Sequence, residues 1–181
     1  MAYNFVAGSS QLLSTATTPV TNAPCTFACW FRVTSLPGSP ATLICISHLL
    51  AGGHAQLLSL RGTNESSRIA AGVFDGGYSQ ALSASAPSIN TWSHAAGVFS
   101  ATNNRIAYLN GTAGTANTVS RPNLANIEAI GIGAVRRTGG GVEFFNGILA
   151  DVGIWNVALT AAEIASLAKG MTCNLVRPQS L

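Results

Sequence analysis

Short apolar runs, each closed by a turn residue, recur along the whole chain and limit its fold more than any other feature. The runs predict strands at 26–33, 41–48, 56–61, 68–74, 78–83, 92–100, 105–110, 129–135 and 144–155. Most are rich in β-branched or aromatic residues, and Gly, Asn, Ser or Pro separates them. This spacing is typical of an antiparallel sandwich and not of alternating strands and helices. The sequence therefore predicts an all-β fold with two sheets.

The clearest strand pair spans residues 92–109. Asn103 and Asn104 are predicted to form the tight turn of this hairpin, because asparagine tolerates the left-handed backbone that such turns need. A second turn is predicted at Asn110 and Gly111, after the hairpin.

All side chains at the end of this hairpin are apolar. Ile106 and Tyr108 alternate with Ala107 and Leu109. Because successive side chains of a strand point to opposite faces, both faces are expected to contact apolar groups.

A single helix is predicted near the C-terminus. Thr160 followed by Glu163 forms a capping box, and Leu159 can pack on Ile164 as a hydrophobic staple. Gly170 supplies the left-handed stop after the helix.

Length and composition limit the number of domains. The chain has 181 residues, of which 48% are hydrophobic, so it folds around a core of its own and is not disordered. We predict one domain over 1–170 and a C-terminal extension over 171–181. Apolar runs such as 41–46 are too short to span a bilayer, so no membrane insertion is expected.

Charge is scarce and dispersed. Nine Lys and Arg against six Asp and Glu give a formal net charge of +3, with no basic stripe of the kind that nucleic acid requires. Only 8% of the residues are charged, whereas soluble domains average about 25%. A surface with so few charges indicates that the chain self-associates or packs against other proteins.

The N-terminal sequence and the cysteines predict that the chain folds in a reducing compartment, the cytoplasm. Residues 1–13 lack a basic segment followed by an apolar one, so no secretory signal is expected. Cys25 and Cys29 lie about 13 Å apart along an extended strand, too far to bridge. With Cys45 and Cys173, they are expected to be free thiols. The Cys and His spacings suggest no metal site.

Five segments of the sequence resemble the laminin-G-like, concanavalin A-like jelly rolls of the LamG type. They are FACWF at 27–31, WSHA at 92–95, AYLNG at 107–111, IGIG at 130–133, and FNGILADVGIWN at 145–156 followed by ALTAAEI at 158–164. The resemblance covers about residues 3–170 and implies a two-sheet antiparallel jelly-roll sandwich with one short C-terminal helix. The ends of the chain, 1–13 and 175–178, also resemble LamG-like proteins encoded by bacteriophages.

The chain departs from the family pattern at two positions. Ser93 stands where the family usually has a histidine, and Ala150 where it commonly has an acidic residue. Where such folds bind calcium, several carboxylates meet at a loop rim, but Asp75 and Asp151 are far apart in the sequence. No cofactor is therefore expected, and calcium is the one that the resemblance leaves open.

The residues do not indicate an enzyme. A glycoside hydrolase of this fold needs two carboxylates about 5–10 Å apart. The acids are scattered and form no alternating acidic strand: Glu65, Asp75, Glu128, Glu143, Asp151 and Glu163. The histidines, His48, His54 and His94, have no nucleophile elbow beside them. We expect no catalytic residues.

Two loops are the candidate sites. Asp75 and Tyr78 flank two glycines, so an aromatic ring and a carboxylate are available for a sugar, although an ordinary Gly-rich turn has the same sequence. Arg136 and Arg137 precede a Gly-rich stretch and offer guanidinium groups to an anion or a neighbouring subunit, or to solvent.

Two further side chains have a structural and a functional interpretation. Asp151 is interpreted as a buried carboxylate that accepts hydrogen bonds, with calcium ligation as the alternative. His94 is interpreted as a core histidine that holds the hairpin to its sheet.

These features together favour a non-enzymatic bacteriophage virion surface protein, either a capsid decoration protein or a fibre component. It would be made in the host cytoplasm, stabilise the particle or adhere weakly to glycans, and be extracellular after lysis. The expected partners are other copies, other virion proteins and cell-surface or environmental glycans. Residues 1–5 and 171–181 are the expected contacts, with the loop of Arg136 and Arg137 as a third candidate. The alternative is a free carbohydrate-binding module or a fragment of a bacterial adhesin.

Overall fold

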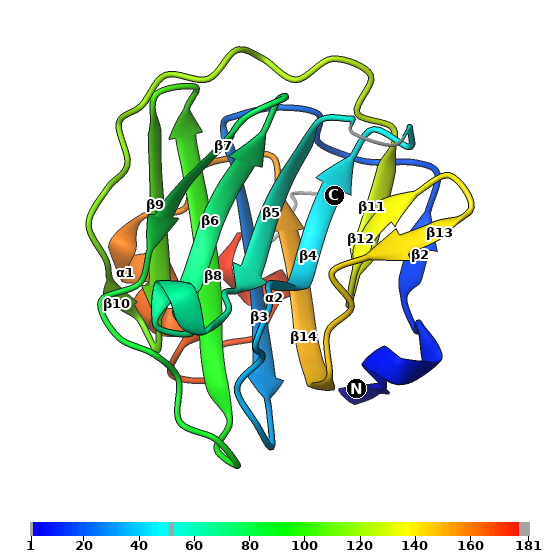
Figure 1. The fold of residues 1–181 in the computed structure, drawn as a ribbon. Coiled ribbons are helices and arrows are strands. Elements are labelled where there is room, and N and C mark those ends of the chain that lie inside the picture. The colour runs from blue at the N-terminus through cyan, green and yellow to red at the C-terminus, as the bar shows by residue number, and fades with distance from the viewer. Residues whose placement is uncertain (1, 51–52, 178–181) are drawn as a thin grey trace.

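The computed structural model describes residues 2–50 and 53–177 and arranges them as two antiparallel sheets packed face to face (Figure 1). Sheet A contains, in spatial order, β1 (Ala2–Phe5), β14 (Gly147–Trp155), β3 (Cys25–Arg32), β8 (Ser93–Ala101), β9 (Asn104–Leu109) and β10 (Thr112–Ala113). Sheet B contains β2 (Leu13–Thr15), β11 (Ala129–Ile132), β4 (Ala41–Ser47), β5 (Ala55–Leu60), β6 (Ile69–Phe74) and β7 (Tyr78–Leu82). A two-stranded hairpin, β12 (Val135–Arg137) and β13 (Gly140–Val142), lies over sheet B.

The predicted jelly-roll sandwich with one short C-terminal helix, α1 (Ala161–Leu167), is confirmed. A four-residue helix, α2 (Cys173–Val176), lies in the predicted C-terminal extension, and residues 178–181 of that extension lie outside the described residues. Two short 3₁₀ turns, η1 (Ala7–Ser9) and η2 (Thr63–Glu65), complete the elements. In the described ranges, no helix has the length and apolar content needed to cross a bilayer.

The predicted strands agree with the observed ones except at two places. The predicted strand 129–135 is broken after β11 at Gly133, which has φ +82° and packs against the ring of Phe5. A side chain at this position would meet that ring. The predicted strand 144–155 begins only at Gly147, since Glu143 before it takes a left-handed backbone with φ 56°.

One of the two predicted turns is confirmed. Asn110 and Gly111 have φ values of 49° and 80° and join β9 to β10. The predicted tight turn of the β8–β9 hairpin is present but lies at Thr102 and Asn103, one residue earlier than predicted, and neither Asn103 nor Asn104 takes the expected left-handed backbone. The register of β8 and β9 also shifts between Phe99 and Ala101, so a bulge precedes the turn.

The main core fills the space between the sheets. Phe27 and Phe99 of sheet A lie 5.4 Å apart between ring centroids, and Ile44, Leu58 and Ile69 of sheet B pack against the same cluster. All five side chains are fully buried or nearly so.

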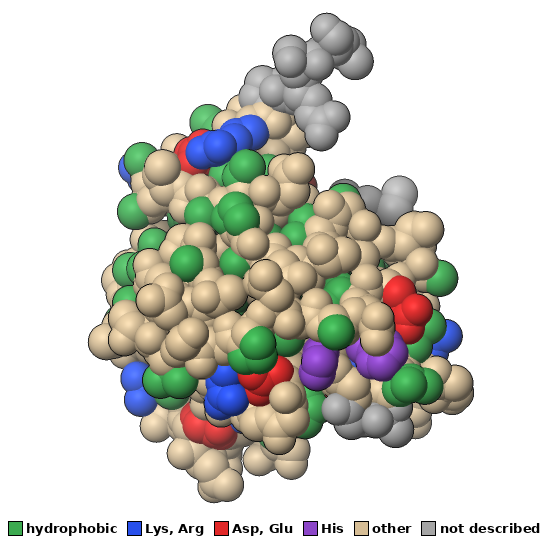
Figure 2. All heavy atoms as spheres, turned by 90° about the horizontal axis from the view of Figure 1, so that it is seen from above, with side chains coloured by type: hydrophobic (Ala, Val, Ile, Leu, Met, Phe, Trp, Pro, Cys, Tyr) green, Lys and Arg blue, Asp and Glu red, His purple; other side chains and the backbone are tan. Residues whose placement is uncertain are grey.

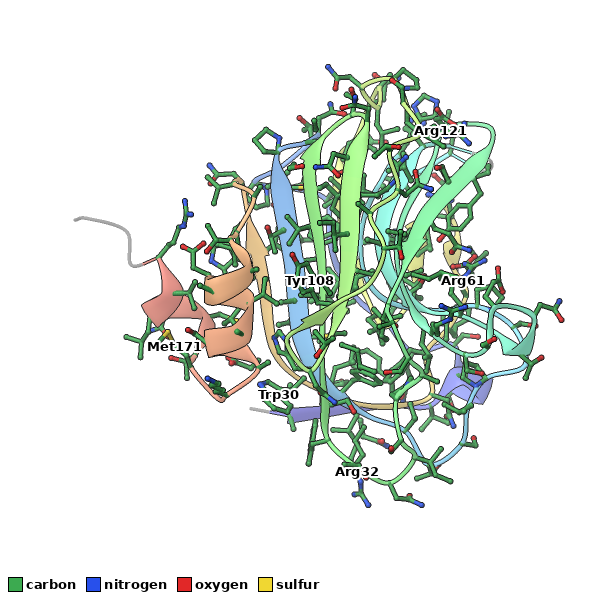
Figure 3. The ribbon with its side chains drawn as sticks, turned by 90° about the vertical axis from the view of Figure 1, so that its left-hand side faces the viewer. Trp30, Arg32, Arg61, Tyr108, Arg121 and Met171 are labelled. Carbon is green, nitrogen blue, oxygen red and sulfur yellow. The ribbon has the colours of Figure 1, made fainter. Side chains whose placement is uncertain are left out.

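A second core lies on the outer face of sheet A, where α1 packs (Figure 3). Ile164 and Leu167 of α1 contact a cluster that contains Ile106 and Tyr108 of β9, while Ala107 of β9 belongs to the main core. The prediction that both faces of this strand contact apolar groups is therefore confirmed.

All four cysteines lie within the described residues and are free, as predicted. The thiol of Cys25 donates to Oε1 of Gln56, and that of Cys173 donates to the carbonyl of Asp151. Burial raises the pKa of Cys25 and of Cys173 to about 12, so both are protonated at neutral pH.

The predicted capping box is present at the start of α1. Oγ1 of Thr160 accepts from the Glu163 amide, and the Glu163 carboxylate accepts from the Thr160 amide at 2.7 Å. Arg177 also donates to this carboxylate at 2.7 Å. The Arg177 contact and the cap hold the pKa of Glu163 at about 2, against an ordinary value of 4.5.

We expect Glu163→Ala to lower the free energy of unfolding at neutral pH by about 1 kcal/mol, as loss of a helix cap does. Because the folded-state pKa lies below the unfolded one, this contribution is complete above pH 4.5 and is lost as the pH falls through 2. Urea unfolding of both proteins across this range measures the difference. The half-exposed Glu128 serves as the control, and a Glu163→Ala deficit that persists unchanged at pH 2 would contradict the assignment.

Candidate functional site

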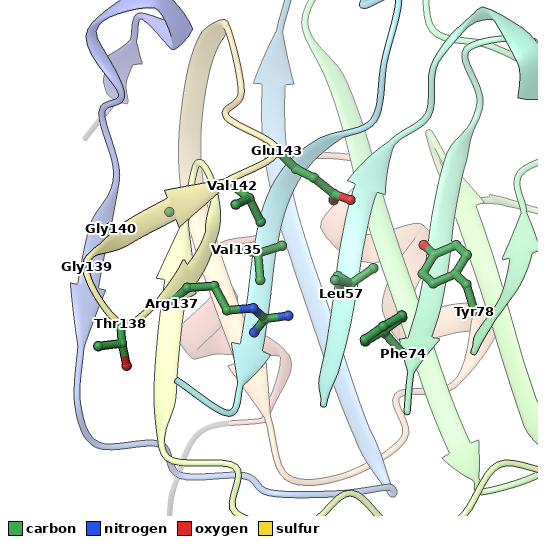
Figure 4. A pocket seen from close by; sticks show the side chains of 11 residues that line it. Leu57, Phe74, Tyr78, Val135, Arg137, Thr138, Gly139, Gly140, Val142 and Glu143 are labelled. Atoms are coloured by element: carbon green, nitrogen blue, oxygen red, sulfur yellow. The ribbon is translucent and has the colours of Figure 1, made fainter. Parts of the chain in front are cut away.

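A depression of about 450 Å³ lies on the outer face of sheet B, between the β12–β13 hairpin and β7 (Figure 4). We call it the sheet B depression. Its lining residues are Leu57, Phe74, Tyr78, Val135, Arg137, Thr138, Gly139, Gly140, Gly141, Val142 and Glu143. The depression therefore joins Tyr78 and Arg137, which the sequence placed in two separate candidate sites.

The floor of the depression follows from the two-residue period of the strands. Leu57 of β5 pairs with Gly72 of β6, and Phe74 of β6 pairs with Tyr78 of β7. Alternate residues of β5 and β6, such as Leu58 and Ala71, point into the main core. Leu57, Phe74 and Tyr78 consequently share the outer face, where they form an apolar and aromatic surface.

Gly72 lets the ring of Tyr78 lie against the sheet. A Cβ at Gly72 would lie 2.7 Å from Cζ of Tyr78 and closer still to its hydroxyl oxygen, distances that no real side chain tolerates. The ring thus occupies the space that a side chain at this position would fill. Glycine in a strand interior often marks such a close approach.

Arg61 holds Tyr78 from the other side of the floor. Its guanidinium carbon lies 4.7 Å from the ring centroid, and Nη1 donates to the Tyr78 hydroxyl at 3.3 Å. Glu65 accepts from Nη2 of Arg61 at 2.9 Å, which fixes the guanidinium in turn. Burial raises the pKa of Tyr78 to about 12, so the hydroxyl remains protonated.

Both predicted arginines hold the β12–β13 hairpin in place. Arg136 donates to the carbonyls of Arg137 and Gly140 within the hairpin. Arg137 donates to the carbonyls of His48 at 2.9 Å and Gly53 at 3.0 Å, which ties the hairpin to the end of β4. Of the two, Arg137 lines the depression and Arg136 does not.

Arg137 and Glu143 place a donor and an acceptor around the apolar floor (Figure 4). Burial lowers the pKa of Arg137, but the guanidinium remains charged at neutral pH. The Glu143 carboxylate accepts from the hydroxyl of Thr42 at 2.9 Å, and the Glu143 carbonyl accepts from the Thr42 amide at 2.8 Å. These contacts fix both polar groups before any ligand binds.

Asp75 lies outside the lining of the depression. Its carboxylate accepts from Nη1 of Arg121 at 2.9 Å and from the amide of Gly77 at 3.3 Å, and its side chain is only 6% exposed. The Gly-rich turn thus directs the acid toward Arg121, 46 residues later in the chain. No local pattern in the sequence indicates this partner.

His94 and Asp151 lie away from the depression. Burial lowers the pKa of His94 to about 4, so its ring is neutral at pH 7, and it packs edge-on to Trp30 at 5.5 Å. Its Nδ1 has no hydrogen-bond partner among the described residues. The hairpin is instead held by backbone contacts of His94 with Asn110. Asp151 sits at a bulge of β14 with φ 48°.

No cluster of three or more His, Cys, Asp or Glu side chains suited to a metal ion occurs in residues 2–50 and 53–177.

The family profile described as the Concanavalin A-like lectin/glucanases superfamily matches residues 7–165 of the chain. The search of curated protein sequences found no match to this chain.

Solved structures share the fold at low sequence identity. NanB sialidase from Streptococcus pneumoniae, in its K499G form, matches with a TM-score of 0.72 and 16% identity over 91% of this chain. This chain spans only 27% of that protein. The CBM40 of a Ruminococcus gnavus IT-sialidase, bound to α2,3-sialyllactose, gives a TM-score of 0.66 and 10% identity over 82% of this chain and 84% of its own.

A third match is domain 4 of AbnA, an extracellular GH43 arabinanase from Geobacillus stearothermophilus, in complex with arabinotriose. Its TM-score is 0.64, with 16% identity over 83% of this chain and 68% of its own.

Proposed function

Because the chain belongs to the Concanavalin A-like lectin/glucanases superfamily, we propose that it is a glycan-binding domain whose binding site is the sheet B depression. One observation carries the proposal: Phe74 and Tyr78 form an aromatic surface across the depression from a fixed donor, Arg137, and a fixed acceptor, Glu143 (Figure 4).

The chemistry of a sugar matches this arrangement. A pyranose or furanose presents C–H groups that pack on aromatic surfaces, here those of the partly exposed Phe74 and Tyr78. Its hydroxyl groups accept from a guanidinium and donate to a carboxylate, here Arg137 and Glu143. A few polar groups on a largely apolar wall are typical of small-molecule sites.

Two solved neighbours support this class of ligand. The CBM40 of the Ruminococcus gnavus sialidase is bound to sialyllactose, and domain 4 of the arabinanase is in complex with arabinotriose. The depression offers one cation and one carboxylate, so its own charge does not favour an acidic sugar over a neutral one.

We propose further that the domain does not catalyse. Four of the acids, Glu65, Asp75, Glu128 and Glu163, lie within ion-pair distance of an arginine or a histidine. Glu143, the one acid of the depression, has no second carboxylate beside it in the lining. A general acid and base pair for glycoside cleavage needs two such groups. The proposed binding uses no metal or other cofactor.

A second proposal concerns where the domain acts: as one of many copies on a bacteriophage particle. The supporting observation is the scarcity of charge, which Figure 2 shows as a few small blue and red groups on a largely uncharged face. Large apolar side chains such as Trp92, Val142 and Leu175 are also 41–62% exposed. Many tethered copies would raise the avidity of a weak site about 100-fold to 10,000-fold. A free carbohydrate-binding module is the alternative.

A glycan array probed with the purified protein tests the first proposal. We expect binding to a restricted group of glycans, retained in the Asp75→Asn variant because Asp75 lies outside the depression, and no release of shortened products. Cleaved glycans would contradict the non-catalytic assignment. An array on which no glycan binds the wild-type protein would contradict glycan binding itself.

Light scattering and mass spectrometry of purified particles test the second proposal. Oligomers in solution and the chain among the particle proteins are expected. A monomer that is absent from particles would leave the free module as the correct alternative.

A further inference from the structure

A small cavity lies at one end of the sandwich, where residues 117–123 cross the sheets. We call it the arginine cavity. It is lined by Asn22, Ala23, Gln56, Val73, Phe99, Ala101, Thr102, Arg105, Arg121, Pro122 and Asn123. Its volume of about 10 Å³ is at the lower limit for one water molecule, so it can hold at most one small species and is too small for a sugar or a phosphate. The cavity is separate from the sheet B depression, with which it shares no lining residue.

Arg105 is the most unusual residue of this cavity, because it is a cation with 1% exposure. Its Nη2 donates to Oγ of Ser79 at 3.0 Å, to Oδ1 of Asn117 at 2.9 Å and to the carbonyl of Val119. All three acceptors are uncharged. Its Nε is buried and has no hydrogen-bond partner among the described residues. A buried cation normally lies beside a carboxylate.

Two further donors line the same cavity. Arg121, which Figure 3 labels at one end of the sandwich, also has a buried Nε without a partner in the described part of the chain. Gln56 is 5% exposed, and its Oε1 accepts from the thiol of Cys25, so its amide nitrogen remains available. The lining contains no Asp or Glu side chain that could accept from these groups.

The local charge does not balance. Arg105 and Arg121 contribute two positive charges, and Asp75, paired with Arg121 at 2.9 Å, contributes one negative charge. One positive charge therefore remains uncompensated. Burial, and the like charge of Arg121, lower the pKa of Arg105, as expected for a cation without a counter-ion.

We propose that the arginine cavity binds a monatomic anion of the chloride type, held by Nε of Arg105, Nε of Arg121 and the amide of Gln56. The anion would balance the local charge and satisfy two buried donors at once. It would also join residues 117–123, through Arg121, to β5 and β9, which carry Gln56 and Arg105. Chloride would then stabilise the fold, because it binds the native state and not the unfolded chain.

The test compares thermal unfolding of the purified full chain in sodium chloride and in sodium gluconate at equal ionic strength. Equal ionic strength makes general screening by salt the same in both solutions, and gluconate is too large to enter the cavity. We expect the midpoint of thermal unfolding to be roughly 3–6 °C higher in chloride. A chloride concentration about tenfold above the Kd of the site gives a rise of this size for a domain of this length. In crystals soaked in bromide, an anomalous peak is expected between Arg105 and Arg121.

Three variants separate this site from other effects of salt. Arg121→Gln leaves Arg105 balanced by Asp75, so the difference between the two salts should disappear even if the variant is less stable. Asp75→Asn raises the local charge, so the difference should increase. Arg32→Gln, at a partly exposed arginine on β3, should leave it unchanged. Equal midpoints for the wild-type protein in both salts, with no bromide peak, would overturn the proposal and assign the cavity to water.

Discussion

Replacing Tyr78 with alanine is expected to lower the affinity for the best array glycan about 10-fold to 100-fold, because the ring supplies both apolar area and a directed aromatic contact. The side chain covers part of the depression floor beside Phe74 and is held there by Arg61. Isothermal titration calorimetry of both proteins with the same glycan gives the ratio. Because the ring also packs on Gly72 and Arg61, some stability should be lost as well, so urea unfolding is measured in parallel and the affinities are compared under conditions where both proteins are folded.

Two control variants make this result specific. Tyr78→Phe retains the ring and loses only the hydroxyl contact with Arg61, so most of the affinity should remain. Tyr3→Ala removes a tyrosine of β1 that is 49% exposed and lies outside the lining of the depression, so the affinity should be unchanged. If Tyr3→Ala weakens binding as much as Tyr78→Ala does, the glycan binds elsewhere.

Gly72→Ala is expected to lower the free energy of unfolding by about 1–3 kcal/mol, as overpacking does. The new Cβ would lie 2.7 Å from Cζ of Tyr78, so the ring must leave the sheet. Glycan affinity should fall at least as far as in Tyr78→Ala. Urea unfolding and calorimetry measure the two losses separately.

The double variant Gly72→Ala/Tyr78→Ala tests the cause of this loss. With the ring absent, the Cβ of the alanine at position 72 still lies 2.9 Å from Cδ1 of Leu57, so only the part of the stability loss that the ring causes should disappear, and the coupling energy measures that part. Gly38→Ala is the matched control, because a Cβ at Gly38 meets nothing within 4 Å. Additive losses in the double variant would show that Tyr78 does not set the cost at Gly72.

The fold was predictable because its strands and its helix carry local signals. The alternation of Ile106 to Leu109 and the Thr160–Glu163 capping box both appear in the structure as predicted. The strands that were missed are β1, β2, β10, β13 and all of β12 beyond Val135; each is four residues long or shorter, and most of their residues are exposed or half-buried. Such edge strands depend on their neighbours for stability and show no alternation of apolar and polar residues that would predict them.

The candidate site was only half predictable from the sequence. Tyr78 and Arg137 were both singled out, but their common depression depends on the β12–β13 hairpin, which folds over sheet B through contacts of Arg137 with His48 and Gly53. Those contacts join positions 84 and 89 residues apart. Asp75 was selected for its local glycines, yet a distant arginine determines where it lies.

Leu57 and Glu143 had no signal as site residues. Leu57 reads as one more core leucine of a strand and is only 4% exposed; it lines the depression because the other face of β5 meets the main core. Glu143 lines the depression because its left-handed backbone ends the hairpin and its carbonyl accepts from Thr42 of β4. The residue pattern within one strand indicates neither which face of β5 meets the core nor that Glu143 contacts Thr42.

A crystal structure of the protein with its best array glycan tests the glycan-binding proposal most directly. The proposal predicts a sugar ring packed on Phe74 and Tyr78, with hydroxyl groups within hydrogen-bond distance of Arg137 and Glu143. A glycan bound at any other surface, with the sheet B depression empty, would contradict it.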